Sequence, residues 1–211
     1  MTSLASDVAK NVATQLSKWR SAGLENVFGE AVLILTAAQY LKERQGYDVE
    51  AEVSACKIFR NMDTKLGEVN YDLHTTKNDR KIIWEMKFPK KSINQRIIYD
   101  LVKLALPDAT SDYQRLFLIA CNNKNKSTLV ARMDNDHNYE FDISRDAARN
   151  LICLSGLAES TKQPEVLTRG SSLREVDKCL GIRQRLRFQI HREATEKIDS
   201  DIVMIFSVVP N

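Results

Sequence analysis

Two stretches in the middle of the chain alternate between apolar and polar residues. In Val69–His74 and in Ile82–Phe88, every second side chain is apolar, which is the period of two that half-buried strands show. The polar residues Lys77–Arg80 lie between the two stretches, and such a cluster is typical of a tight turn. The sequence therefore predicts a β-hairpin, and a turn centred on Asn78-Asp79 determines which residues pair across it.

This predicted hairpin brings charged side chains together. Its register places Asp72 opposite Glu85, and it leaves both carboxylates and Lys87 on one half-exposed polar face. Two carboxylates so placed repel each other unless one is protonated or a cation lies between them. A hard divalent ion such as Mg²⁺, which takes oxygen ligands, meets that need, and Lys87 adds a positive charge beside it. The simpler alternative is a solvated strand face on which Lys87 offsets the two acids.

Elements before and after the hairpin follow from similar patterns. Apolar residues at spacings of three and four predict helices, and alternating or continuous apolar runs predict strands. The predicted order is a helix at 7–22, a helix at 25–45, a strand at 47–53, the hairpin, a helix that ends at Pro107, and a buried strand at 116–120. From the second helix onward, this order is α-β-β-β-α-β.

The second predicted helix carries an acidic residue, Glu30, among its apolar positions. The expected buried stripe consists of Val27, Ala31, Ile34, Leu35, Ala38 and Leu41. A carboxylate on the buried face of a helix is costly unless a charged group pairs with it. Glu30 is therefore a candidate functional residue, and the alternative is an edge position where it bonds to a Lys or Arg.

The order of these residues resembles that of the PD-(D/E)xK nucleases. In that family an acidic residue on a first helix precedes a β-hairpin that carries an Asp and then an E-x-K motif. Asp72 matches the motif Asp, and Glu85-Met86-Lys87 matches E-x-K, whereas Tyr71 replaces the Pro that precedes the Asp in the family. The resemblance implies an α/β fold with a restriction-endonuclease-like α-β-β-β-α-β core over about residues 25–121, in which helices flank a mixed central sheet.

The resemblance also implies roles for the catalytic residues. Glu30, Asp72 and Glu85 would be ligands of Mg²⁺ or Mn²⁺. Lys87 would orient or deprotonate the attacking water, or stabilise the pentavalent phosphate, and these roles remain open alternatives. The number of metal ions, one or two, is also open.

A second match follows the hairpin. The segment Gln95–Tyr99 resembles the Q-x-x-x-Y element that comes after E-x-K in the RecB-type branch of the family. Gln95 and Tyr99 are four residues apart and share one face of a helix, with Lys103 a further turn along. The resemblance implies that this face meets the DNA backbone beside the metal.

The remainder of the chain, about residues 127–211, predicts a C-terminal α+β extension. Apolar patterns and candidate helix caps indicate strands at 128–133, 185–191 and 202–209, and helices at 144–154 and 172–181. The last of these strands is almost wholly apolar, so we expect it in the interior.

Composition is that of an ordinary globular protein. With 211 residues, 43% of them hydrophobic and 28% charged, the chain is long enough for one core, and we expect a single nuclease-like domain over residues 1–211. No apolar run approaches the roughly 18 residues of a membrane span, and the first residues lack the features of a signal peptide, so we expect a cytoplasmic protein without membrane contact. Neither a glycine-rich phosphate motif nor a zinc-type Cys pair occurs, which argues against a nucleotide cofactor and a zinc hydrolase.

The net charge of +3 is small, but the basic residues are unevenly spread. Segments 77–96 and 169–192 each carry seven Lys or Arg against two acidic residues, which fits either a phosphate-binding surface or a solvated face. In a strand, the arginines at 183, 185 and 187 would project from one face, either along phosphates or as a charged edge. The expected nucleic-acid contacts are Lys90, Lys91, Gln95, Arg96, Tyr99, Arg183, Arg185 and Arg187.

These features predict a metal-dependent deoxyribonuclease of restriction, phage-defence, repair or recombination type, with DNA as its partner. One alternative is a non-catalytic nucleic-acid-binding module on a nuclease fold. Another is an RNA-cleaving endonuclease of related fold, which usually takes a histidine ligand from its first helices, whereas no His precedes His74 here. A homodimer is compatible with the sequence.

Overall fold

The computed structural model describes residues 3–59, 69–88, 94–106, 112–122, 128–135, 138–146, 151–156, 165–167 and 185–211. The helices of this part are α1 (Leu4–Ser21), α2 (Glu30–Glu43), α3 (Ala55–Ile58), α4 (Asn94–Ala105) and α5 (Thr128–Asn135), with a 3-10 turn, η1 (Glu25–Val27). The strands are β1 (Asp48–Ser54), β2 (Asn70–Lys77), β3 (Arg80–Lys87), β4 (Tyr113–Asn122), β5 (Asn138–Asp146), β6 (Leu151–Gly156), β7 (Glu165–Leu167), β8 (Arg185–Ile198) and β9 (Asp201–Pro210).

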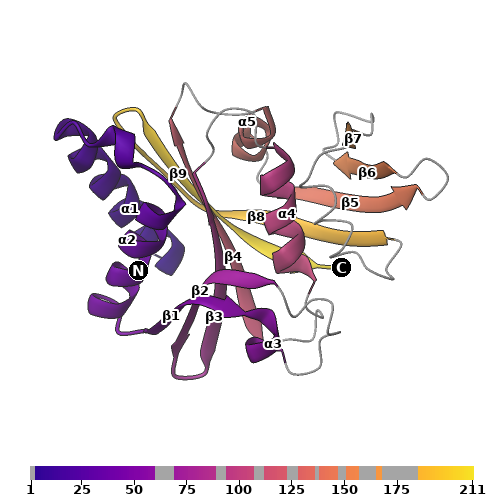
Figure 1. The fold of residues 1–211 in the computed structure, drawn as a ribbon, viewed down its shortest axis with the longest axis horizontal. Helices are drawn as coiled ribbons and strands as arrows, with labels where there is room; N and C mark the ends of the chain where they lie inside the picture. Colours follow the sequence, from indigo (N-terminus) through magenta and orange to yellow (C-terminus); the bar gives the residue numbers. More distant parts are fainter. Residues whose placement is uncertain are drawn as a thin grey trace.

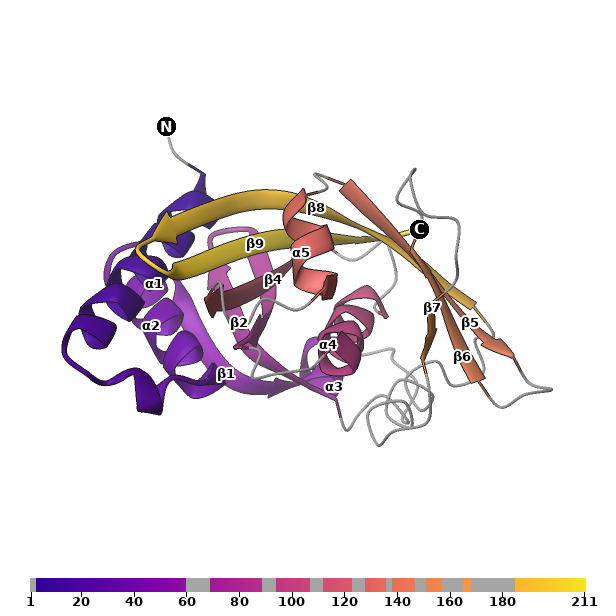
Figure 2. The same cartoon turned by 90° about the horizontal axis from the view of Figure 1, so that it is seen from above.

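One sheet runs through all of these strands, in the order β1-β2-β3-β4-β9-β8-β5-β6-β7. Neighbouring strands are antiparallel except β3 and β4, which are parallel, so the sheet is mixed. Helices α1 and α2 pack on one face, and α4 and α5 pack on the other (Figures 1 and 2). The predicted α/β class and the mixed sheet flanked by helices are therefore confirmed.

The β2–β3 hairpin has the predicted register near its turn. Lys77 pairs with Arg80, so the turn consists of Asn78-Asp79. Asn78 has a φ of 51°, a left-handed conformation that Asn tolerates better than most residues and that tight hairpin turns require. On one face of the hairpin, the indole N–H of the buried Trp84 donates to the Thr75 hydroxyl over 3.0 Å. This bond satisfies the only polar atom of the largest buried side chain in the hairpin.

Strand β4 is the predicted fully buried strand. Its central residues 116–120 are at most 1% exposed, because helices cover both faces of the sheet at this point. It runs parallel to β3 and is reached through α4, which is the crossover that a parallel pair requires. From α2 to β4, the helices longer than one turn and the strands follow the predicted α-β-β-β-α-β order.

Helix α1 packs on the face of the sheet opposite α4 and α5. Its stripe at spacings of four, Val8, Val12 and Leu16, is buried as expected. Near its end, the Arg20 guanidinium lies 2.5 Å from the carboxylate of Asp201, a side chain with no exposed surface at the start of β9. This partly buried ion pair fixes α1 to the strand that lies beside β4.

The predicted helix at 25–45 is divided in the structure. Residues 25–27 form η1, and Gly29 caps the start of α2. The buried residues of α2 are Leu33, Thr36, Ala37 and Leu41. Of the predicted stripe, Leu35, Val27 and Ala31 are exposed, the first two by 65% and 61%. The other half of the stripe lies inward, since Ile34 and Ala38 pack against the core and Leu41 is buried. Apolar residues lie on two adjacent stripes of this helix, and helical spacing alone does not decide which stripe faces the sheet.

Two predictions for the C-terminal extension are wrong. Residues 128–133, predicted as a strand, lie in α5, where Leu129, Val130 and Met133 are buried. Their spacing of one and four fits a helix face, which the short apolar run concealed. Of the predicted helix at 144–154, the described residues 144–146 and 151–154 lie instead in β5 and β6, since pairing within the sheet overrides a weak local helix preference. The predicted helix at 172–181 lies outside the described residues.

The predicted strands at 185–191 and 202–209 are present and are longer than expected. They form the long β8–β9 hairpin, whose tight turn contains Asp199 at a φ of 54°. Because β9 pairs with β4, the extension continues the sheet of the preceding part (Figure 2). No helix in the described ranges has the length and apolar character needed to cross a membrane.

Candidate functional site

Six charged side chains gather where β2, β3 and α4 meet the first turn of α2. This set, the carboxylate–lysine cluster, consists of Glu30 from α2, Asp72 from β2, Glu85 and Lys87 from β3, and Asp100 and Lys103 from α4. Glu85 and Lys87 were expected on a half-exposed face, but they are only 2% and 7% exposed. The reason is α4, which packs against β3 and β4 on the face of the sheet from which these two side chains project.

Asp72 is not part of the β2–β3 ladder, so its predicted pairing with Glu85 is absent from the ladder. The β2–β3 ladder ends one pair before it, and Asp72 Oδ2 accepts a hydrogen bond of 2.6 Å from the backbone N–H of Met86. The next strand is distorted at the same level, because Glu52, which lies opposite Asp72 on β1, has a φ of 54°. A side-chain carboxylate thus replaces a ladder bond, and this bond holds Asp72 at the end of β3 beside the E-x-K residues.

Lys87 lies between two carboxylates from different helices. Its Nζ is 2.7 Å from Asp100 Oδ2 and 3.1 Å from Glu30 Oε1. Glu30 is the first residue of α2 and its side chain is 42% exposed, so it does not lie on a buried helix face as predicted. The helix begins later than expected, and Glu30 precedes its buried stripe by one turn. A carboxylate in the first turn is also favoured by the helix dipole.

Lys103 neutralises the most deeply buried acid of the cluster. Its Nζ lies 2.6 Å from Glu85 Oε1 and 3.9 Å from Asp100 Oδ1. The ring centres of Tyr99 and Tyr71 are 5.5 and 6.0 Å from the same Nζ, so two aromatic faces add cation–π attraction. Lys103 therefore points inward to the cluster and not outward toward solvent.

The pKa values of three carboxyls in the cluster are raised. Burial raises the pKa of Asp72 to about 6, against the effect of its backbone hydrogen bond. Burial, aided by two neighbouring carboxylates, raises the pKa of Glu85 well above its usual value in spite of Lys103. Burial also raises the pKa of Asp100, although Lys87 opposes the change. All three groups would therefore gain from an added positive charge.

The pKa values of the two lysines are raised as well. Burial lowers the pKa of Lys87, but Asp100 and Glu30 more than offset it. The same balance holds for Lys103, where Glu85 and Asp100 outweigh burial. Both side chains are consequently held as ammonium groups at neutral pH.

The cluster has more carboxylates than ammonium groups. When its four acids are ionised, they exceed the two lysines by two negative charges. Hard oxygen donors with excess negative charge suit Mg²⁺ or Mn²⁺. In the described part of the chain, no group of three or more His, Cys, Asp or Glu is arranged to hold a metal ion as it stands. The oxygen donors and their net charge thus suit a divalent ion, whereas their present arrangement does not. Lys103, which lies 2.6 Å from Glu85 Oε1, would have to move away before Glu85 could bind the ion.

The expected DNA contacts around the hairpin are only partly described. Lys90 and Lys91 lie outside the described residues, as does the side chain of Gln95. Arg96 is exposed in the first turn of α4. Tyr99 was expected to face DNA, but it is partly buried and packs against the core and Lys103.

Two of the three arginines expected to track phosphates bind a carboxylate of the chain. Arg185 Nε donates to Asp142 Oδ1 over 2.7 Å, and Arg187 Nε donates to Oδ2 over 3.1 Å. Leu186, which lies between them, belongs to the core that contains α4 residues. Because side chains alternate along a strand, the two arginines lie on the sheet face opposite α4 and the cluster. Arg183 lies outside the described residues.

The sequence prediction missed Asp100, and it gave Lys103 the wrong direction. A signal for both was present in α4. Its apolar residues Ile97, Ile98, Leu101, Val102, Leu104 and Ala105 are all buried, which leaves one narrow polar side. Asp100 and Lys103 are three residues apart on that side, where each can pair with an oppositely charged group of β3.

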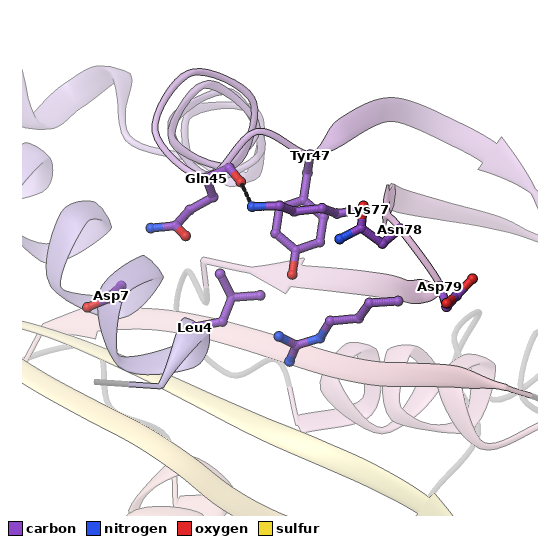
Figure 3. A pocket seen from close by; sticks show the side chains of 8 residues that line it. Leu4, Asp7, Gln45, Tyr47, Lys77, Asn78 and Asp79 are labelled. Atoms are coloured by element: carbon purple, nitrogen blue, oxygen red, sulfur yellow. Dashed lines mark hydrogen bonds between the residues drawn. The ribbon is translucent and has the colours of Figure 1, made fainter. Parts of the chain in front are cut away.

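A separate pocket of about 500 Å³ lies at the turn end of the hairpin (Figure 3). Its charged lining residues are two cations, Lys77 and Arg80, and two acids, Asp7 and Asp79. The Lys77 Nζ lies 2.6 Å from the backbone oxygen of Gln45, so its charge is engaged within the chain. The pocket contains no residue of the carboxylate–lysine cluster.

Neither the protein-family models, nor the curated proteins, nor the solved structures with which the chain was compared give a match. A functional interpretation therefore depends on the geometry and chemistry of the cluster.

Proposed function

We propose that this chain is a metal-dependent deoxyribonuclease of the PD-(D/E)xK type. The observation that carries the proposal is the convergence of Glu30, Asp72, Glu85 and Lys87 in one cluster, in which Glu85 and Lys87 are buried. These residues were singled out from sequence positions up to 57 apart. A solvated strand face, the simpler alternative, is inconsistent with the burial of Glu85 and Lys87.

The arrangement of the elements supports the same proposal. The order from α2 to β4, with β3 parallel to β4, is the order that a restriction-endonuclease-like core requires. Buried groups with strongly perturbed pKa values and specific charge partners are also more frequent at functional sites than elsewhere.

In this proposal, Asp72 and Glu85 hold Mg²⁺ or Mn²⁺, and Glu30 supports the site through its contact with Lys87. When bound, the ion supplies Lewis acidity toward the scissile phosphate and lowers the pKa of its water. The residues of the chain orient the DNA backbone and exclude bulk water, which strengthens every charge interaction in the site.

Lys87 acts in the proposed reaction as a fixed positive charge. Its ammonium group lies within 3.1 Å of Glu30 and within 2.7 Å of Asp100, and both contacts favour the protonated form. A protonated amine cannot accept the proton of the attacking water. Of the three roles left open by the sequence, deprotonation of the water is therefore the least supported, whereas orientation of the water and stabilisation of the developing phosphate charge both suit an ammonium group.

Cleavage assays test the proposal directly. We expect the protein to cleave at least one of linear, covalently closed circular and branched DNA in Mg²⁺ or Mn²⁺, and to leave all three intact with a chelator. Cleavage of the closed circle would identify an endonuclease, and cleavage restricted to linear DNA an exonuclease. Intact substrates under all conditions, at protein concentrations that bind DNA, would refute a nuclease function.

A specific observation favours a second candidate, a DNA-binding module without catalysis. Lys103 and Lys87 already neutralise Glu85 and Asp100 at 2.6 and 2.7 Å, and a cluster stabilised in this way does not require a metal. The two candidates differ in metal binding. Calorimetric titration with Mn²⁺ should give a binding isotherm for the nuclease and none for the module.

The salt dependence of DNA affinity should identify the DNA-binding face. We expect Arg96→Gln to flatten the slope of log affinity against log salt by about 0.9, the contribution of one phosphate contact. Replacing both Arg185 and Arg187 with Gln should change the slope by less than this, because Asp142 binds both side chains on the face opposite α4. A larger change in the double variant would place the DNA path along β8.

A further inference from the structure

Lys103 has two carboxylate acceptors within reach. Its Nζ is 2.6 Å from Glu85 Oε1 and 3.9 Å from Asp100 Oδ1. Asp100 precedes it by three residues on α4, so the two side chains are neighbours on one helix face. A rotation of the Lys103 side chain is therefore enough to exchange one carboxylate for the other, without any shift of α4.

The backbone and the aromatic surroundings of Lys103 keep this exchange local. The Tyr71 hydroxyl donates to the backbone oxygen of Lys103 over 3.1 Å, which ties this turn of α4 to β2. The rings of Tyr71 and Tyr99 lie within 6.0 Å of the ammonium group. The lysine is 7% exposed, so its charge remains beside the cluster in either position.

A divalent ion and Lys103 would compete for the same carboxylate. In the proposed nuclease, Glu85 is a metal ligand, and its Oε1 is the atom that Lys103 contacts. A divalent ion bound to this oxygen would lie beside the Lys103 ammonium group and repel it strongly, even when the effective dielectric constant is about 20. Asp100 offers Lys103 a nearby anionic alternative, and its other oxygen meanwhile retains Lys87 at 2.7 Å.

We infer that Lys103 is an internal counter-ion, which neutralises Glu85 when no divalent ion is bound and moves to Asp100 when one binds. This inference rests on the proposed function, because it takes Glu85 as a metal ligand. Lys103 then lowers the affinity for the metal and stabilises the fold in its absence. Asp100 is a positioning residue that receives Lys103 and holds Lys87 throughout.

Substitution of Lys103 separates this role from that of a purely structural ion pair. In metal-free buffer, Lys103→Met should melt at a lower temperature than the wild type, because Glu85 is left buried without a partner. Added Mn²⁺ should restore the melting temperature, and the variant should bind Mn²⁺ at least about tenfold more tightly in calorimetry. Lys103→Gln, which removes the charge but keeps a hydrogen-bond donor, should change affinity in the same direction and serves if Lys103→Met does not fold.

The part played by Asp100 is tested by a double-mutant cycle. Asp100→Asn should weaken Mn²⁺ binding in the wild-type background, because Lys103 then lacks its second acceptor. The same substitution should have a smaller effect in the Lys103→Met background. Equal effects in the two backgrounds would show that Asp100 acts only through its own charge and would overturn the exchange.

Other outcomes distinguish this inference from the proposed function. If the wild type binds Mn²⁺ and cleaves DNA, and both Lys103 variants bind the ion no more tightly, the inference fails and the nuclease proposal stands. If neither the wild type nor any variant binds Mn²⁺ and none cleaves DNA, both fail.

Discussion

Substitution of Glu85 by Gln should reduce DNA cleavage by about a thousandfold or more, and Lys87→Met should reduce it by about a hundredfold to a thousandfold. Glu85→Gln removes a proposed metal ligand while it keeps the size of the side chain. Lys87→Met removes the positive charge that Glu30 and Asp100 hold at 3.1 and 2.7 Å. Initial rates of plasmid cleavage at saturating Mg²⁺ measure both effects, with DNA affinity measured in parallel.

The choice of substitutions follows from the burial of these side chains. Truncation of Glu85 to Ala would remove the closest partner of the Lys103 ammonium and leave a gap in the buried part of the cluster, so lost activity could reflect lost structure. A suitable control is Asp79→Asn at the opposite end of the hairpin, which should cleave at the wild-type rate. If the folded Glu85→Gln protein cleaves at that rate as well, the site assignment is wrong.

The hairpin was predictable from sequence because its determinants are local. The alternation of apolar residues and the turn at Asn78-Asp79 specify the register from Lys77–Arg80 up to the pair before Asp72. Prediction failed at Asp72, where the side chain bonds to the Met86 N–H and ends the ladder. On the neighbouring strand β1, Glu52 adopts a left-handed φ of 54° at the same level, and no local pattern of the hairpin encodes either feature.

Residues from distant segments were harder to predict than the hairpin. Asp100 became recognisable only when α4 was placed over β3, because its partner Lys87 belongs to another element. Ala31 and Leu35 of α2 were placed on the buried stripe for the same reason, although both are exposed. Amphipathic spacing predicts that a helix packs, whereas the choice between two adjacent apolar stripes depends on the surface that it meets.

The metal-free protein should become less stable as pH rises from about 4 to above 6, which is opposite to the usual behaviour of a paired carboxylate. Burial raises the pKa of Asp72 from 3.8 to about 6 in the folded protein. In this window the folded state binds more protons than the unfolded state, so the free energy of unfolding decreases as pH rises. A difference of this size corresponds to about 3 kcal/mol once Asp72 is fully ionised.

Asp72→Asn should remove this loss of stability, because an amide does not ionise. Its oxygen can still accept the hydrogen bond that the Met86 N–H donates to Asp72 Oδ2 over 2.6 Å. Urea unfolding in chelator should therefore give similar stabilities near pH 4 and a more stable variant at pH 8. Mg²⁺ should reverse the order at pH 8, because it binds the ionised carboxylate and stabilises only the wild type by mass action.

Equal Mg²⁺ responses in the two proteins would show that Asp72 is not a metal ligand. If the stability of the wild type does not fall between pH 4 and 8, Asp72 ionises in the folded protein without cost. The excess negative charge of the cluster would then not explain why a cation binds there.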